Sequence, residues 1–298
     1  MKTLYIDCFS GISGDMMVGA LIDAGVSFEK IQQELEKLNL AGYQLAVRKV
    51  MKEGISSTKF EVLLEKDEHD HHHVNEVHDH SHHHHEHEND GVHHVHNHHH
   101  DHHNHHHDHH SHDHDHHGHS HHHRSYADIL QLIEESELSS GVKERSKQIF
   151  APIAKSEAKI HNMPIENVHF HEVGAVDSIV DIVATAIALE ELEIERVISA
   201  HVPLGSGSIR CAHGIYPVPA PATLDMMKNI PIAPTDLTYE LTTPTGAAIV
   251  VSQADDFGTL PALNMEAIGY GAGTRDIPNR PNVLRIMIGE ELKKKQVI

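Results

Sequence analysis

The pattern of hydrophobic and polar residues predicts a sheet flanked by helices. Residues 3–8 form a short apolar run, which predicts a buried strand. Residues 16–24 and 28–38 repeat their apolar positions with the period of a helix. Residues 43–51 and 58–64 alternate apolar and polar side chains, which predicts an antiparallel hairpin through Gly54.

The same kind of pattern returns after residue 123. Ser125 is placed as the N-cap of a helix, and a helical apolar stripe begins near residue 175. These elements predict an α/β or α+β fold with a mixed sheet, whose strand order cannot be derived from such short runs. Further helices and strands are expected at residues 126–135, 142–161, 196–202, 223–227 and 282–288.

Residues 67–123 interrupt this pattern. They contain 32 of the 37 histidines and 12 Asp or Glu, with no Lys or Arg and almost no apolar side chains. So little apolar surface cannot offset the entropy of ordering, so a disordered insertion between residues 1–66 and 124–298 is predicted. Imidazole and carboxylate groups bind nickel, zinc, copper and cobalt. Candidate metal ligands in this histidine tract are His82, His83, His98, His99, His105, His106, His121 and His122.

Charge and cysteine content narrow the class of protein. The formal charge is −21, of which the tract contributes −12. The rest of the chain contains 23 basic and 32 acidic side chains. An acidic body without a basic stripe argues against nucleic acid as a partner. Cys8 and Cys211 form no C-x-x-C pair, so neither a disulfide framework nor a thiolate zinc site is predicted. The sequence shows no signal peptide and no membrane-length apolar run, and we expect a cytoplasmic protein.

A glycine-rich turn joins the first predicted strand to the first predicted helix. This arrangement gathers free backbone N–H groups around an anion, as in many phosphate sites. Candidates for nucleotide binding here are therefore Ser10, Gly11, Ser13 and Gly14. The Walker lysine is absent, so the turn is not a P-loop. A tight turn that places Asp15 favourably for the helix dipole explains the same residues equally well.

The segment from residue 169 to residue 181 combines several ionisable side chains. His169 and His171 point to the same side of an extended chain, with Glu172 beside them. Asp177 and Asp181, four positions apart, share one face of the predicted helix. This mixed nitrogen and oxygen set suits Ni, Zn, Mn or Mg. The alternative is a helix start and hydrogen-bonded core histidines without a ligand.

Two later loops add candidate binding residues. Gly205 and Gly207 lie in a loop where backbone can approach a ligand closely. His213 lies between small residues in a loop, where a core histidine would be unusual. Thr245 follows Pro244 at a predicted helix start, where helix capping and a phosphate or ribose contact are both possible roles.

Several sequence blocks together resemble the LarC family of nickel-insertion proteins. The blocks are Asp-Cys-Phe-Ser-Gly-Ile-Ser-Gly-Asp-Met, His-Phe-His-Glu-Val-Gly-Ala-Val-Asp-Ser-Ile-Val-Asp, Val-Pro-Leu-Gly-Ser-Gly with Pro-Val-Pro-Ala-Pro-Ala, and Thr-Pro-Thr-Gly-Ala-Ala. The resemblance implies a CTP-dependent cyclometallase that places Ni²⁺ into a thiocarboxylated pyridinium mononucleotide, forming one Ni–C and two Ni–S bonds. It also implies Mg²⁺ or Mn²⁺ with CTP, and a product used by lactate racemase. Longer members carry a C-terminal domain associated with CTP, so we expect this chain to be the N-terminal portion. Possible partners are the C-terminal half, lactate racemase apoprotein and further copies of this chain.

The resemblance gives the candidate residues roles. The tract would concentrate nickel, and ordered ligands would hold it for transfer, namely His169, His171, Glu172, Asp177, Asp181 and His213. A base must take the ring proton that the Ni–C bond replaces, and Asp7, Asp15 and Asp177 are the candidates, with Mg²⁺ binding as another role for Asp7 and Asp15. A non-catalytic nickel store would need only the tract. A metal-dependent phosphohydrolase is a third hypothesis.

Overall fold

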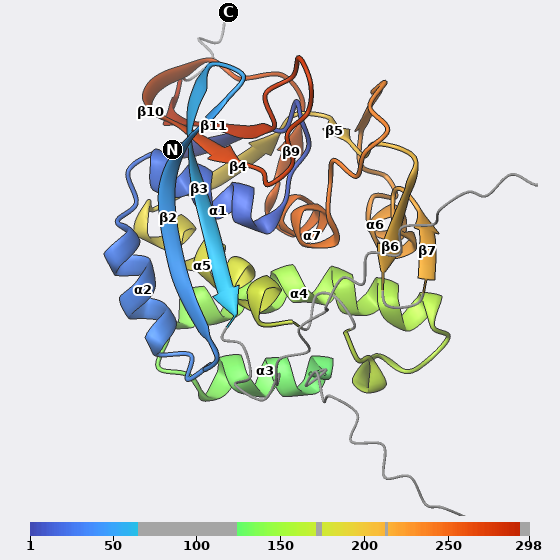
Figure 1. Ribbon diagram of the computed structural model, residues 1–298. Helices are drawn as coiled ribbons and strands as arrows, with labels where there is room; N and C mark the ends of the chain where they lie inside the picture. The colour runs from blue at the N-terminus through green and yellow to red at the C-terminus, as the bar shows by residue number, and fades with distance from the viewer. Residues whose placement is uncertain (65–123, 171–174, 212–213, 293–298) are drawn as a thin grey trace, which may run out of the picture. The chain divides into compact units, whose positions relative to one another are not determined.

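Among the described residues, seven strands form one mixed sheet. The computed structural model describes residues 1–64, 124–170, 175–211 and 214–292 (Figure 1). The strand order is β2-β3-β10-β11-β1-β4-β9, with β1 parallel to β4 and antiparallel to β11. The predicted mixed sheet is therefore confirmed. The strands are β1 (Lys2–Asp7), β2 (Tyr43–Lys52), β3 (Ile55–Leu64), β4 (Arg196–Ser199), β9 (Asp256–Phe257), β10 (Leu263–Ala272) and β11 (Val283–Glu291).

Helices cover one face of this sheet. In Figure 1, α1, α5, α4 and α3 follow one another away from the strands, and α7 lies beside α4. α1 packs directly on β10 and β3, α5 packs on α1, and α4 packs on both α5 and α7. The helices are α1 (Gly14–Asp23), α2 (Phe28–Glu36), α3 (Tyr126–Glu135), α4 (Ser140–Ile160), α5 (Val176–Glu191), α6 (Pro221–Met226) and α7 (Pro244–Gln253), with a 3₁₀ turn at Ile165–Asn167.

Alternation along the central strands separates the two faces of the sheet. Leu4 and Ile6 point into the main core under the helices, whereas Tyr5 belongs to a small cluster with Ile198 and Met287. These three residues are cross-strand neighbours in register on β1, β4 and β11. Because side chains alternate along a strand, Asp7 lies on the same face as Tyr5, opposite the helices.

Glycines in β10 let α1 approach the sheet closely. A Cβ on Gly271 would lie 1.8 Å from the carbonyl oxygen of Met16, and one on Gly269 would lie 2.0 Å from that of Ala20. β10 was not predicted from the sequence, because glycines lower the strand propensity of this segment. The glycine run is thus a helix-packing surface, and it sets how closely α1 packs against the sheet.

Several predicted elements are confirmed and some bounds differ. The hairpin of β2 and β3 turns at Glu53 and Gly54, which both have positive φ. Ser125 caps α3 in a capping box with Asp128. The strand expected at residues 196–202 is divided into β4 and β5 (Val202–Pro203). Among the described residues, two short strand pairs lie outside the seven-stranded sheet. β5 pairs with β8 (Ile232–Ala233), and β6 (Ser208–Cys211) pairs with β7 (Gly214–Pro217).

The segments before and after the tract share one sheet and one core. β3 precedes the tract in the sequence, yet it pairs with β10 and contacts α1 and α5. The tract itself lies outside the described residues. Within the parts of the chain that the structure describes, no helix is both long and apolar enough to cross a membrane.

Replacing Gly271 by alanine tests the contact between α1 and β10. The new methyl group would collide with backbone rather than with a flexible side chain, so we expect a loss of about 2 kcal/mol or more in the free energy of unfolding. Urea denaturation measures this. Gly258→Ala is the matched control, since nothing lies within 4 Å of its Cβ position, and it should change stability by less than about 0.5 kcal/mol. Equal stability of both variants would contradict the close contact.

Candidate functional site

Three helices begin at one cavity of about 500 Å³. Residues at the starts of α1, α5 and α7 line it, and β3 forms another wall. Backbone N–H groups at a helix start have no partner within the helix and carry a partial positive charge. The residues that line the cavity include Ser13, Gly14, Asp15, Lys59, Asp177, Ser178, Asp181, Glu240, Thr243, Thr245 and Thr274.

The start of α1 is shaped by a close contact with α5. Ser13 is the N-cap, but its hydroxyl donates to Asp15 instead of capping the helix. A Cβ on Gly14 would lie 2.5 Å from Oδ2 of Asp181, so only glycine leaves space for that carboxyl group. The glycine of the turn therefore brings the α5 carboxyl group against the first turn of α1.

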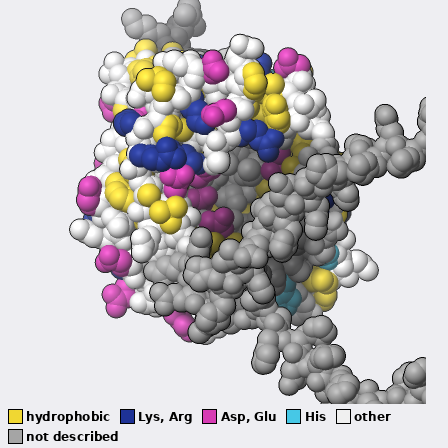
Figure 2. Space-filling model, in the orientation of Figure 1, with side chains coloured by type: hydrophobic (Ala, Val, Ile, Leu, Met, Phe, Trp, Pro, Cys, Tyr) yellow, Lys and Arg dark blue, Asp and Glu magenta, His cyan; other side chains and the backbone are white. Residues whose placement is uncertain are grey.

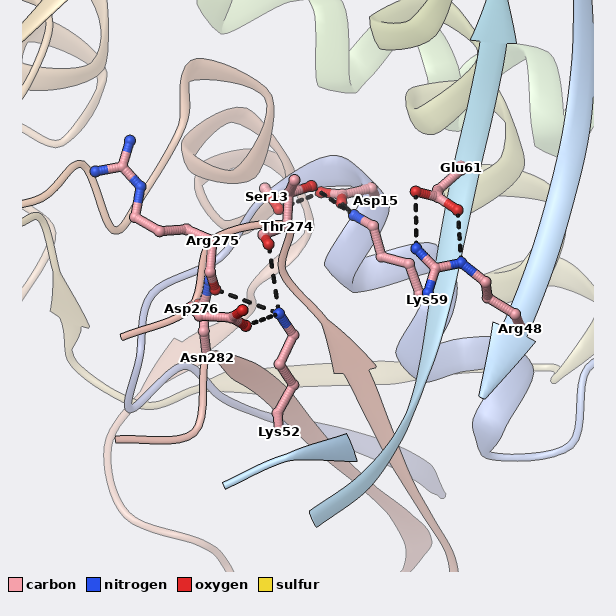
Figure 3. Close-up of polar contacts among 10 residues, drawn as sticks. All are labelled: Ser13, Asp15, Arg48, Lys52, Lys59, Glu61, Thr274, Arg275, Asp276 and Asn282. Atoms are coloured by element: carbon pink, nitrogen blue, oxygen red, sulfur yellow. Dashed lines mark hydrogen bonds and ion pairs between the residues drawn. The ribbon is translucent and has the colours of Figure 1, made fainter. Parts of the chain in front are cut away.

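Lys59 supplies a buried positive charge to the cavity. Its ammonium group forms an ion pair with Asp15 and lies 2.8 Å from the hydroxyl of Thr274 (Figure 3). Its side chain is only 5% exposed. Lys59 thus connects β3 to the start of α1 and to the loop that follows β10.

Further ion pairs surround this contact. Lys52 binds Asp276 at 2.6 Å, and Nε of Arg48 donates to Glu61 at 3.0 Å (Figure 3). Figure 2 shows lysine and arginine side chains gathered in one band on this face, directly beside acidic side chains. Most of the positive charge around the cavity is therefore already paired.

Asp181 is a buried carboxyl group of the cavity with only partial compensation of its charge. Its Oδ1 is buried and has no hydrogen-bond partner within the described parts of the chain. Burial raises the pKa of Asp181 well above its ordinary value, and the negative charges of Asp15 and Asp177 raise it further, while Lys59 opposes them. A proton on Asp181 lowers the negative charge of the cavity, which favours an anionic ligand.

The start of α7 closes another side of the cavity. The hydroxyl of Thr243 accepts from the backbone N–H of Gly246 at 3.2 Å, so Thr243 acts as the N-cap. A Cβ on Gly246 would lie 2.1 Å from the carbonyl oxygen of Ile12, which places α7 against the turn before α1. Thr245 lines the cavity beside this cap.

The structure brings some predicted site residues together and separates others. Six of them line this cavity, namely Ser13, Gly14, Asp15, Asp177, Asp181 and Thr245. Asp7 instead forms an ion pair with Arg285 and lines a different cavity. Ser10 donates its hydroxyl to the carbonyl of Pro281.

The predicted loop glycines pack against backbone. Gly11 and Gly205 have positive φ and approach the carbonyl oxygens of Leu241 and Tyr239 closely. Gly207 also has positive φ and lies near Thr238. None of the three lines the cavity. They hold the strand-like segment that carries Glu240 to the cavity wall, so their nucleotide-binding role stays a prediction.

The predicted metal ligands are mostly outside the described residues. His171, Glu172, His213 and the tract histidines all fall there. His169 is described, is exposed, and pairs through its backbone with Ser125 rather than lining the cavity. Within the described ranges, no group of three or more His, Cys, Asp or Glu side chains is arranged to hold a metal ion.

Lys59 and Thr274 are site residues that the sequence did not reveal. Lys59 occupies a polar position in an alternating strand, where the pattern predicts exposure to solvent. Thr274 follows a glycine run without any distinctive motif. The signal for both is three-dimensional, because Lys59 is defined by its contacts with Asp15 and Thr274, and Thr274 by its contact with Lys59.

The fold and cavity define an α/β protein with a polar cavity at the starts of three helices. A family model described as nickel insertion protein matches residues 4–298. The chain is 55% identical over 294 residues to the pyridinium-3,5-bisthiocarboxylic acid mononucleotide nickel insertion protein of Geobacillus kaustophilus, covering 98% of this chain and 61% of that relative. The protein of the same name from Desulfitobacterium hafniense is 41% identical over 290 residues, which cover 97% of this chain and 59% of that relative. No solved structure matches.

This chain belongs to the nickel insertion protein family. It spans less than two thirds of the length of the two relatives named above, at 61% and 59%.

Replacing Asp181 by asparagine tests its electrostatic environment. Because the pKa of Asp181 is raised in the folded state, the unfolded chain releases this proton at a lower pH than the folded chain does. The free energy of unfolding therefore falls as the pH rises above about 4. Asp181→Asn removes this cost and should raise the free energy of unfolding by about 1–2 kcal/mol at pH 7. The difference should disappear below about pH 3, where the group is protonated in both states.

Urea denaturation at several pH values measures this effect. Asp177→Asn is the matched control, because Asp177 is exposed at the same helix start and should change stability by only about 0.5 kcal/mol. A destabilised Asp181→Asn variant at neutral pH would contradict the described environment.

Proposed function

We propose that this chain takes part in inserting nickel into pyridinium-3,5-bisthiocarboxylic acid mononucleotide, the compound in the name of its relatives. We further propose that the cavity at the three helix starts holds this mononucleotide. The convergence of α1, α5 and α7 on one cavity together with Lys59 is the observation that carries the proposal.

The helix starts around the cavity, rather than its side-chain charges, support a phosphate-bearing substrate. A mononucleotide carries a phosphate, and helix starts are common phosphate sites because their N–H groups and dipoles favour negative charge. The start of α7 offers this environment without an acidic residue in its first turn. The phosphate is therefore placed at α7, beside Thr243 and Thr245, with the pyridinium ring toward the carboxyl groups of α5.

The carboxyl groups suit the proton transfer that insertion requires. When nickel replaces a ring hydrogen, one C–H bond breaks, one Ni–C bond forms and one proton leaves. Two thiocarboxylate sulfurs complete the product through two Ni–S bonds. Asp177, which lines the same cavity, can receive the ring proton. The raised pKa of Asp181 favours its protonated form, so Asp181 is not the proposed base. Asp15 is held by Lys59, so it positions that lysine.

The histidine tract is the proposed source of nickel. Its histidines and acids offer exchangeable nitrogen and oxygen ligands, which can release the ion to softer sulfur ligands. Leu63 lines the cavity, and β3 ends at Leu64, only a few positions before the tract begins. At the other end, the backbone N–H of Phe170 donates to the carbonyl of Arg124, next to His169. His169, His171, Glu172 and His213 stay proposed ligands for nickel in transit.

The resemblance to longer family members extends the proposal beyond this chain. CTP with Mg²⁺ or Mn²⁺ would act in the part of the longer relatives that lies beyond the matched 61%. Lactate racemase apoprotein would receive the product, in the cytoplasm, and further copies of the chain are possible partners. A nickel store that delivers the ion to a partner is the competing function, for which the tract alone would suffice.

Mass spectrometry of small molecules tests the proposed insertion. The chain is incubated with Ni²⁺, CTP, Mg²⁺ and the thiocarboxylated mononucleotide, alone and with the C-terminal half of a longer family member. We expect a product that gains nickel and loses the protons that its new bonds replace. Nickel bound to the protein without product in either mixture would contradict insertion and favour the store.

Lys59→Met tests the place of the reaction in the same assay. Loss of the positive charge leaves the carboxylate of Asp15 unpaired at the cavity, where it repels the phosphate, and this should raise the KM for the mononucleotide by about tenfold or more. Lys49→Met is the matched control, since Lys49 lies on the same hairpin as Lys59 but pairs with Asp23 of α1. Its side chain is 64% exposed. Unchanged kinetics in folded Lys59→Met would contradict the proposed cavity.

A further inference from the structure

A second cavity, of about 400 Å³, lies on the face of the sheet opposite the helices. Tyr5 and Asp7 of β1 line it, together with Ala200 and His201, which follow β4. It therefore lies at the carboxyl ends of two adjacent parallel strands, the usual place for ligands in open α/β sheets. It shares no lining residue with the cavity at the helix starts.

Asp7 lines this cavity and is held by an ion pair. Arg285 donates from Nε at 2.9 Å and also from Nη2, and both groups bind Oδ2 of Asp7. Within the described parts of the chain, Oδ1 of Asp7 accepts no hydrogen bond. The Asp7 side chain is only 15% exposed, so the free oxygen is oriented by the ion pair and partly withdrawn from water.

Apolar walls accompany this oxygen. Phe9 is 38% exposed at the cavity, although Cys8 and Ser10 on either side of it are buried. Pro203 and Pro234 form further apolar surface. The hydroxyl of Tyr5 donates to the carbonyl of Gly258 at 3.0 Å and holds the loop that closes the cavity. Structural pairing of Asp7 with Arg285 explains neither the exposed phenyl ring nor the hollow beside it.

We propose that this cavity binds a small heteroaromatic molecule, which stacks on Phe9 and donates an N–H to Oδ1 of Asp7. A cavity of this size holds one or two rings. A flat ring matches the phenyl and proline surfaces, and a donor matches a carboxylate oxygen that already has a fixed orientation. The ligand site does not depend on nickel insertion.

Ligand-observed saturation-transfer NMR tests this site on the full chain. The probes are ring-methylated adenine and cytosine, in which the exocyclic amine is the sole N–H donor, and their dimethylamino derivatives, which lack that donor. We expect at least one amine probe to bind, and its dimethylamino derivative to bind about tenfold more weakly or not at all. No binding by any amine probe at millimolar concentration, or equal binding of an amine and its derivative, would overturn the proposal.

Two variants place the bound probe in the cavity. Phe9→Ala should weaken binding about two- to tenfold through loss of ring contact, and Asp7→Asn should weaken it about tenfold or more. Asp276→Asn is the matched control, because its side chain is 89% exposed outside this cavity, and it should bind as the wild type does. Phe9→Ala decides the outcome if loss of the Arg285 ion pair unfolds Asp7→Asn. Wild-type affinity in folded Phe9→Ala would overturn the proposal.

Discussion

The candidate site depends on the buried ammonium group of Lys59. A buried cation is costly unless it is paired, and Asp15 together with the hydroxyl of Thr274 satisfies this one. The three partners come from β3, the first turn of α1 and the loop after β10, which are far apart in the sequence. The ion pair and the hydrogen bond therefore join three walls of the cavity, beside the first turns of α1, α5 and α7.

Close backbone contacts bring those helix starts together. Gly271 lets α1 lie directly on β10, Gly14 admits the carboxyl group of Asp181, and Gly246 lets α7 approach Ile12. Each contact removes the space that a Cβ would need, so none of the three helices can move away without opening the core. The positive ends of the helices and the partly compensated carboxyl group of Asp181 are consequences of this packing. Function is thus linked to positions that a sequence pattern marks only as glycine.

Local signals predicted more of the fold than of the site. Ser125 before an amphipathic run predicted α3 and its cap, and the spacing of Asp177 and Asp181 placed both on one face of α5, where they line the same cavity. β10 was missed because its glycines serve contact with α1, and Lys59 was missed because its burial depends on distant partners. Asp7 and Asp15 were given the same candidate roles, but they lie at different cavities. Asp7 lies on the face of the sheet opposite the helices, whereas Asp15 lies in the first turn of α1. The roles of residues beyond the described ranges, including those of the tract, stay predictions.

Isothermal titration with two forms of the substrate tests the central claim, that the three helix starts bind the phosphate of the mononucleotide. The thiocarboxylated pyridinium mononucleotide is compared with the corresponding nucleoside, which lacks only the phosphate. The account predicts at least about tenfold weaker binding of the nucleoside to the wild type, because charged hydrogen bonds to helix N–H groups are lost. It also predicts that a Thr243→Val, Thr245→Val double variant reduces this difference. Equal affinity of the wild-type chain for the two compounds would contradict the account.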